Sequence, residues 1–258
     1  MNLLILFWFV FGTVIGSFLN AVIYRLPKGE TLLGRSKCPC CRKVLTFFEL
    51  IPLISYVFLR GKCSNCESKI SVQYPLVEVA SGLVWLFAYT LGDTLTHLIL
   101  LGVIFSLLIA IFTYDVLHML IPDVFSMPLI VLSFILLFVE NESVSFELLA
   151  VGPILALFFF ILWLISKGRW MGFGDVKLAI PLGWLAGVQG AFFVFLLSFW
   201  IGAIVSIFLI LVLSVIRKEK IFSMKSQVPF APFLIIAYFI VEYWNISFEK
   251  VLSVVSVL

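Results

Sequence analysis

The stretch AFFVFLLSFWIGAIVSIFLILVLSVI, residues 191–216, decides the fold, because it runs for 26 residues without a charged side chain. A helix that crosses a bilayer needs about 20 consecutive apolar residues. The whole chain of 258 residues is 63% hydrophobic and only 12% charged. A soluble globular domain is about half apolar and about a quarter charged. The composition therefore predicts an integral membrane protein and excludes an ordinary soluble domain.

Similar apolar runs recur along the chain, and each predicts a membrane helix. We therefore expect an all-α fold, a polytopic membrane helix bundle of about eight transmembrane segments. The sixth run is short and continues almost directly into the seventh at Gly190, so it is expected to be tilted or only partly inserted. The eight runs are residues 2–23, 75–92, 97–114, 124–139, 147–166, 178–190, 191–216 and 228–244.

The first run is interpreted as a retained anchor whose N-terminus lies outside the cell. No basic residue precedes Arg25, and no clear small-residue cleavage site follows the run. A cleaved signal peptide carries positive charge in front of its apolar region and a cleavage site behind it. We therefore count this run as the first of the membrane helices.

The distribution of basic residues predicts which loops face the cytoplasm. Sixteen of the 17 Lys and Arg residues fall in segments 24–75, 166–177 and 217–227, and the last, Lys250, lies in the tail. Cytoplasmic loops of membrane proteins are enriched in Lys and Arg. With eight crossings and an external N-terminus, all three basic segments are expected on the cytoplasmic side. The charge pattern and the number of crossings therefore agree.

The largest polar region holds two C-x-x-C pairs, Cys38 with Cys41 and Cys63 with Cys66. Four thiolates in two tight turns suit tetrahedral zinc, and metal binding would fold a loop too small to bury its own core. We therefore expect a small cytoplasmic zinc-binding loop. Two disulfides, or a redox role for one pair, are the alternatives. The fifth cysteine, Cys40, is either a spare thiol or a substitute for Cys41.

Two aspartates stand at the expected cytoplasmic ends of membrane helices. Asp115 follows one long apolar run, and Asp175, in the stretch GFGD, precedes another. Such a carboxylate is costly unless it faces a bundle interior or a wet cavity. Two carboxylates facing each other would share a proton, so one could activate water while the other polarises a peptide carbonyl. We interpret the two as an acid–base pair, with the glycines before Asp175 allowing a backbone kink and close approach of a substrate strand.

Other polar residues near these two have simpler interpretations. Asp123 follows Pro122 and is interpreted as the N-cap of the next helix. The two histidines, His97 and His118, are interpreted as polar or packing residues outside the acid–base pair. Lys177 is expected to anchor the helix, by snorkelling or as a positive-inside charge, or to tune the local charge.

Two glutamates and two glycines complete the set of unusual residues in the first third of the chain. Glu49 and Glu78 both adjoin apolar stretches, and Glu78 falls inside the second predicted helix. An acidic residue in a membrane helix is a functional candidate, and pairing with a loop Lys or Arg is the alternative. Gly12 and Gly16 form the small-xxx-small pattern of closely packed membrane helices.

Four stretches, in this order, resemble the type IV prepilin leader peptidases. They are GTVIGSFLNAVIYRLP near the start, the paired cysteines leading to SVQYPLVE, then YDVLHMLIPD, and finally GFGDVKL. The stretch VPFAPFL at residues 228–234 is similar to a late segment of the same family. The resemblance covers nearly the whole chain.

The resemblance implies an aspartic endopeptidase of the bacterial plasma (inner) membrane. Such an enzyme removes the basic leader from prepilins or pseudopilins at the cytoplasmic face. By match to the family pattern, Asp115 and Asp175 are the catalytic pair. The implied zinc ligands are Cys38, Cys41, Cys63 and Cys66.

The resemblance also implies a methyltransferase activity that uses S-adenosylmethionine to methylate the new N-terminal residue, often Phe. Residues 1–75 would be the part associated with methyl transfer, and residues 76–258 the protease. Glu49 and Glu78 are the candidate cofactor-binding residues. The expected partners are prepilin or pseudopilin substrates and the lipid bilayer, with no nucleic acid.

Two other classes of protein fit parts of the pattern. A transporter could use Asp115 and Asp175 as ion relay groups, although its carboxylates would be expected nearer the bilayer midplane. A membrane thiol oxidoreductase could use the C-x-x-C pairs, although one that oxidises secreted proteins would hold them outside the cell. A protease fits both the order of the motifs and the position of the aspartates at the membrane margin.

Overall fold

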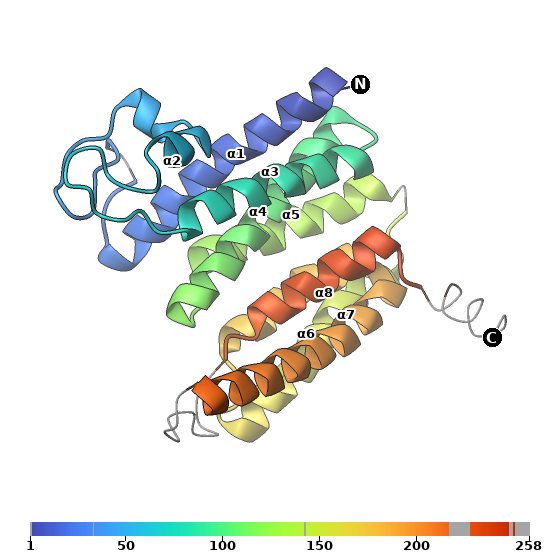
Figure 1. Ribbon diagram of the computed structural model, residues 1–258. Helices are drawn as coiled ribbons and strands as arrows, with labels where there is room; N and C mark the ends of the chain where they lie inside the picture. Colours follow the sequence, from blue (N-terminus) through green and yellow to red (C-terminus); the bar gives the residue numbers. More distant parts are fainter. Residues whose placement is uncertain (1, 33, 142, 217–227, 248–249, 251–258) are drawn as a thin grey trace. The chain divides into compact units, whose positions relative to one another are not determined.

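The computed structural model describes residues 2–32, 34–141, 143–216, 228–247 and 250, and this part of the chain is helical (Figure 1). It contains no strand, only two isolated antiparallel bridges, Lys37 with Val44 and Lys62 with Lys69. The α-helices are α1 (Asn2–Arg25), α2 (Ile54–Phe58), α3 (Gln73–Leu91), α4 (Leu95–His118), α5 (Asp123–Glu140), α6 (Phe146–Ser166), α7 (Phe173–Ile216) and α8 (Ala231–Trp244), with 3-10 turns η1 (Leu26–Lys28) and η2 (Phe47–Leu50).

Six of these helices are long and apolar enough to cross a membrane, and α8 is a shorter apolar helix. Only 17% to 50% of each apolar stretch is buried within the protein. Large apolar side chains therefore cover the outer surfaces of the helices, as a lipid environment requires. The predicted polytopic helix bundle is confirmed. The six are α1, α3, α4, α5, α6 and α7.

Helix α7 contains a break that splits it in two. Gly187 has φ 66° and ψ −179°, a backbone conformation that essentially only glycine adopts. The prediction placed this boundary at Gly190 and started the shorter segment at residue 178. The structure moves the break three residues earlier and extends the first half back to Phe173. Hydropathy did not reveal the difference, because a glycine at a break and a glycine inside a helix have the same hydropathy.

The chain forms two compact units, residues 1–113 and residues 114–258, and their boundary falls inside α4. In the first unit, α1 packs along α3. A Cβ atom on Gly12 would lie 2.6 Å from the Ser81 carbonyl oxygen, and one on Gly16 would lie 2.8 Å from the Cα atom of Glu78. The predicted small-xxx-small pattern is therefore a real helix-packing surface, because only glycine permits this approach.

The polar segment 26–72 connects α1 to α3 along the sequence, and it is drawn in blue to cyan in Figure 1. It folds around two short loops that each begin at a C-x-x-C pair. Lys37 and Val44 bridge the first loop, and Lys62 and Lys69 bridge the second. The two loops repeat one backbone pattern 25 residues apart.

In the second unit, α5, α6 and α8 each pack against α7. Helices α6 and α7 cross closely, because a Cβ atom on Gly183 would lie 2.7 Å from the Cα atom of Gly152. The indole N–H of Trp184 donates a hydrogen bond of 3.0 Å to the Leu149 carbonyl oxygen across the same contact. The predicted basic residues Arg217, Lys218, Lys220 and Lys225 lie outside the described residues.

Candidate functional site

The two aspartates singled out by the sequence line one cavity of about 530 Å³ in the second unit. Asp115 lies in the last turn of α4, and Asp175 is the third residue of α7. Their side chains are buried, with exposed fractions of 5% and 6%. The structure therefore brings together two carboxyl groups that are 60 residues apart in the sequence.

The two helix ends have opposite effects on a negative charge at these two carboxyl groups. Asp175 lies in the first turn of α7, where the positive end of the helix dipole favours a negative charge. Asp115 lies near the C-terminal end of α4, where the dipole opposes one. The backbone N–H of Ala231, the first residue of α8, compensates by donating a hydrogen bond to the Asp115 carboxylate. The stretch VPFAPFL thus contributes directly to the site.

The two glycines before Asp175 do not form the expected kink, since neither has a left-handed φ. Gly174 lies in the first turn of α7, and a Cβ atom there would lie 2.8 Å from the Cβ atom of Ile121. Gly172 is looser: its added Cβ atom would lie 3.9 Å from the Asp175 carboxylate. The Gly172 carbonyl oxygen accepts a hydrogen bond of 3.3 Å from the Asp175 N–H. Gly174 is therefore needed for close packing rather than for a kink.

Asp123 and Lys177 form an ion pair of 2.5 Å on the wall of the same cavity. The N-cap of α5 is Pro122, so the interpretation of Asp123 as the N-cap is wrong by one residue. Asp123 stands instead in the first helical turn, where the dipole also favours its charge. Lys177 is thereby held beside Asp123. His118 packs against the Tyr114 ring at a centroid distance of 4.5 Å.

Four of the five cysteines gather into one cluster in the first unit, with their sulfur atoms within 4.8 Å of one another. The Cys38 and Cys66 sulfurs are 3.9 Å apart, and those of Cys41 and Cys63 are 4.0 Å apart. Four sulfurs at about 2.3 Å from a tetrahedral zinc ion are separated by about 3.8 Å. The cluster therefore matches the spacing of a four-thiolate metal site. Cys40 is exposed and stands outside it, so Cys41 supplies the second sulfur.

The two cysteine loops share one backbone geometry. The N–H of Cys38 donates to the Lys43 carbonyl at 2.9 Å, and the N–H of Cys63 donates to the Ser68 carbonyl at 2.9 Å. Arg42 and Glu67 occupy matching left-handed positions, with φ of 57° and 54°. Backbone N–H groups of each loop hydrogen-bond its first sulfur, and those of Cys41 and Cys40 lower the pKa of Cys38. Such turns stabilise thiolates, the form that binds a metal ion.

The Ser68 hydroxyl group adds to this effect. It lies 3.1 Å from the Cys66 sulfur, and together with its own N–H it lowers the pKa of Cys66 to about 6. All five cysteines are free thiols in this structure. The donor set and its surroundings therefore fit a metal ion, and the site could hold one.

Glu49 links the two cysteine loops. Its carboxylate accepts hydrogen bonds from Lys43 at 3.0 Å, from the Thr46 N–H at 2.7 Å and from the Ser64 hydroxyl group. Lys43 belongs to the first loop and Ser64 to the second. These donors, led by Ser64, lower the pKa of Glu49 to about 2. The contacts of Glu49 are those of a structural clamp, and its role in binding a cofactor stays a prediction.

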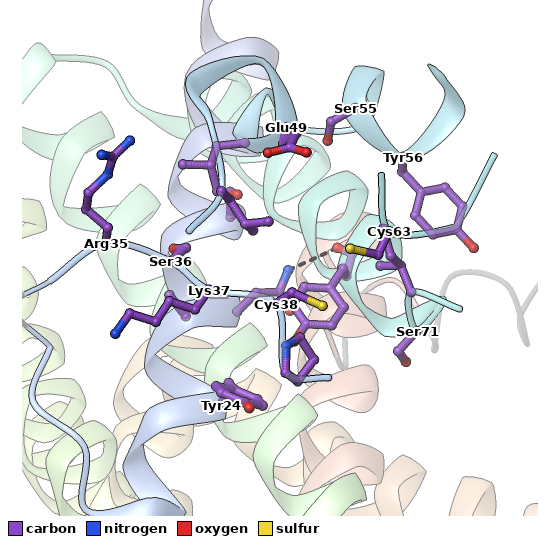
Figure 2. Close-up of a pocket in the computed structure, with 18 of the residues that line it drawn as sticks. Tyr24, Arg35, Ser36, Lys37, Cys38, Glu49, Ser55, Tyr56, Cys63 and Ser71 are labelled. Carbon is purple, nitrogen blue, oxygen red and sulfur yellow. Dashed lines mark hydrogen bonds between the residues drawn. The ribbon is translucent and has the colours of Figure 1, made fainter. Parts of the chain in front are cut away.

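Glu78 lines a large cavity of about 990 Å³ that also reaches Glu49 and the cysteine cluster (Figure 2). Its side chain is buried, with 7% exposed. The Leu53 N–H donates a hydrogen bond to its Oε2 atom at 2.8 Å, and Ser17 of α1 lines the same cavity. In Figure 2, Arg35 and Lys37 lie on one side of this cavity, and Tyr56 and Ser71 lie on the other.

Sequence reasoning missed two contributors to these sites. Asn20 lines the large cavity from α1, and its only sequence signal is an amide side chain in an otherwise apolar helix. Ala231 contributes a backbone N–H, which no side-chain pattern can reveal. Polar side chains inside membrane helices are rare enough to mark candidate sites, so the first could have been found.

The fold and these sites define a class of protein: a polytopic helical membrane protein with a buried pair of carboxyl groups and a separate loop that carries a four-cysteine cluster. A family model described as Bacterial Peptidase A24 N-terminal domain matches residues 10–91, and one described as Type IV leader peptidase family matches residues 102–207. The chain belongs to the type IV leader peptidase family.

Relatives in several bacteria extend this match over most of the chain. A prepilin leader peptidase/N-methyltransferase of Vibrio cholerae serotype O1 is 35% identical, covering 76% of this chain and 82% of the relative. Proteins of the same description from Stutzerimonas stutzeri and Legionella pneumophila are 33% and 31% identical. Each match covers 92% of this chain, with 89% and 90% of the relative. No solved structure matches the chain significantly.

Proposed function

We propose that this chain cleaves the leader peptide from type IV prepilins or pseudopilins and then methylates the new N-terminus. The observation that carries the proposal is the pair of buried carboxyl groups, Asp115 and Asp175, on one cavity. Both fall within the stretch that matches the leader peptidase family, residues 102–207. The relatives that cover most of the chain are described as having both activities.

Cleavage would proceed without a covalent intermediate. One aspartate, ionised, takes a proton from a water molecule as the water oxygen attacks the scissile carbonyl carbon. The other, protonated, donates a hydrogen bond to the carbonyl oxygen and stabilises its developing charge. Proton transfer to the leaving nitrogen then breaks the peptide bond. Burial of both groups supports this mechanism, because a low-dielectric cavity strengthens such electrostatic interactions.

The site would face the cytoplasm of a bacterial cell, at the margin of the plasma membrane. Asp115 and Asp175 lie at the ends of apolar helices rather than near their middles, which supports a cut where an apolar substrate helix leaves the bilayer. Exposed Asp123 on the cavity wall could attract a basic leader, although Lys177 offsets part of its charge. The concentration of Lys and Arg in the loops supports this orientation.

Methyl transfer would take place in the first unit, at the large cavity between α1, α3 and the cysteine loops. S-adenosylmethionine, when bound, supplies an electrophilic methyl group. Cys38, Cys41, Cys63 and Cys66 would hold a structural zinc ion that fixes the loops around this cavity. Glu49 would act by clamping the loops together, and Glu78 by facing the bound reactants.

The test is a processing assay in membranes. The protein is co-expressed with a tagged prepilin or pseudopilin from the same genome, and leader removal is followed by gel mobility. We expect Asp115→Asn and Asp175→Asn to abolish cleavage at unchanged protein level. Asp123→Asn is the matched control and should still cut, since Asp123 pairs with Lys177 at the cavity wall. Cleavage by either of the first two variants would show that the assigned pair is wrong.

A further inference from the structure

The lining of the large cavity contains a buried oxygen atom without a hydrogen-bond partner. Asn20 of α1 is 2% exposed, and its Nδ2 atom donates to the Tyr74 carbonyl oxygen at 3.0 Å. Its Oδ1 atom has no partner in the described part of the chain. A buried polar atom without a hydrogen-bond partner destabilises the fold. Asn20 also lines the cavity, so a ligand there could supply the missing donor.

Glu78 presents a second hydrogen-bond acceptor in the lining of the same cavity. Within the described ranges, no Lys, Arg or His forms an ion pair with it. A carboxylate has about four acceptor sites, and the Leu53 N–H uses one of them. The loop Lys or Arg partner expected as an alternative from the sequence is therefore not found among these residues.

The packing of α1 on α3 places these two acceptors close together. Asn20 contacts the carbonyl group of Tyr74, and Glu78 follows Tyr74 by one helical turn on the same face. Ser17 precedes Asn20 by three residues on the same face of α1, and Ser17, Asn20 and Glu78 all line the cavity. The close approach at Gly16, 2.8 Å from an added Cβ to the Cα of Glu78, fixes this arrangement.

We infer that Asn20 and Glu78 form a binding site for a primary ammonium group. An –NH₃⁺ group offers three N–H donors and one positive charge. The Asn20 Oδ1 atom lacks a donor, and the Glu78 carboxylate lacks a counter-ion, so the group satisfies both deficits at once. Hydrogen bonds to charged groups are stronger than those between neutral groups, so such a contact would contribute strongly to affinity.

This inference rests on the proposed function only for the source of the ammonium group. Two reactants of methyl transfer carry one: the new N-terminal amine of the processed chain and the amino acid part of S-adenosylmethionine. The basic side chains Arg35 and Lys37 also line this cavity, on the side opposite Tyr56 and Ser71 (Figure 2). Glu78 therefore offers a binding point for a cation in a cavity that several basic side chains also line.

The experiment compares ligands that differ only in the ammonium group, using the full chain with Asp115→Asn in nanodiscs. The first arm measures binding of a short apolar peptide with a free N-terminal Phe against its N-acetylated form. The second arm measures S-adenosylmethionine against its N-acetylated form, which keeps the sulfonium group and the carboxylate. We expect a preference of about 10-fold or more for the ammonium-bearing ligand in one arm. The arm that shows it identifies the source.

Variants then assign that preference to residues. Glu78→Gln keeps an acceptor for the Leu53 N–H and removes the charge, so the preference should fall below about 2-fold while the ligand without an ammonium group binds unchanged. Asn20→Leu should also reduce the preference for the ammonium-bearing ligand. Glu30→Gln is the matched control, because Glu30 lines the same cavity but is exposed, and it should leave the preference intact.

Each outcome decides the inference. No preference in either arm, or a preference that survives in Glu78→Gln, would overturn it and leave a bound water as the donor to Asn20. If the binding preference is present but the wild-type protein does not methylate a processed substrate, the proposed methyltransferase activity is wrong and the binding site stands. The binding measurement therefore separates the failure of the site from the failure of the reaction.

Discussion

At the scale of single residues, the metal site of the cysteine loops depends on which of two neighbouring thiols supplies a sulfur ligand. Cys40 and Cys41 are neighbours, yet the sulfur of Cys41 belongs to the cluster and Cys40 is exposed. The sequence left this choice open, because both thiols lie in one short turn. The loop geometry decides it, since Cys38, Cys41 and Arg42 match Cys63, Cys66 and Glu67 position by position.

We predict one zinc ion per chain, lost on Cys41→Ser and retained on Cys40→Ser. Removing one of four thiolates lowers affinity, because zinc then keeps three protein ligands. Metal content of the purified protein, measured by mass spectrometry, checks this. Equal zinc loss in both variants would mean that Cys40 takes part in the site.

Glu49 gives a second prediction, on the dependence of stability on pH. The folded-state pKa of Glu49 lies near 2, below its ordinary value of 4.5. Its stabilising contribution is therefore fully present above pH 4.5 and lost as the pH falls toward 2. We expect Glu49→Gln to loosen the cysteine loops at pH 7, by about 1 kcal/mol, and to have little effect near pH 2.

Hydrogen exchange of residues 43–50, corrected for its intrinsic pH dependence, measures this difference. Glu67→Gln is a suitable control, because Glu67 lies in the second loop and its side chain is exposed. A penalty for Glu49→Gln that stays constant between pH 4.5 and pH 2 would show that its charge is not what holds the loops.

At the scale of elements, helix boundaries depend on backbone conformation as well as on hydropathy. The apolar runs predicted α1, α3, α4, α5, α6 and α8 to within a few residues, because 20 apolar residues leave few alternatives in a membrane. The break in α7 was placed at Gly190 instead of Gly187. Gly187 follows Ala186 and Gly190 follows Gln189, and it is the φ of 66° at Gly187 that marks the break.

Alanine substitutions should separate these two glycines. Gly187→Ala has free space around its side chain, so its cost is purely conformational, about 1–3 kcal/mol for a backbone region that essentially only glycine adopts. Gly190→Ala gains about 0.5–1 kcal/mol of helix propensity and meets Ala186 and Val241 at 3.2 and 3.3 Å, so we expect little net change. Thermal unfolding in detergent checks both. If Gly190→Ala were the more destabilising of the two substitutions, the break would lie at Gly190.

At the scale of the whole molecule, the sequence predicted the type of fold, and which candidate residues lie together, better than it predicted their surroundings. The carboxyl pair was found because aspartates are costly in a membrane protein, and the cysteines because their spacing is distinctive. Asn20 and the N–H of Ala231 were missed, since their roles arise from packing of α1 on α3 and from the start of α8. The division into residues 1–75 and 76–258 stays a prediction.

The orientation of the chain in the membrane gives the last prediction. Cys40 is exposed and outside the metal cluster, so it is a natural reporter for the cysteine loops. We expect a membrane-impermeant maleimide to leave Cys40 unlabelled in intact cells and to label it in inverted membrane vesicles, because the surrounding loop is rich in Lys and Arg. Cys40→Ser shows which part of the signal comes from this thiol. Ser143→Cys in the Cys40→Ser background, between α5 and α6, should behave in the opposite way. Labelling of Cys40 from outside would place the loops on the external face, and a leader peptidase that cuts basic leaders in the cytoplasm would no longer fit.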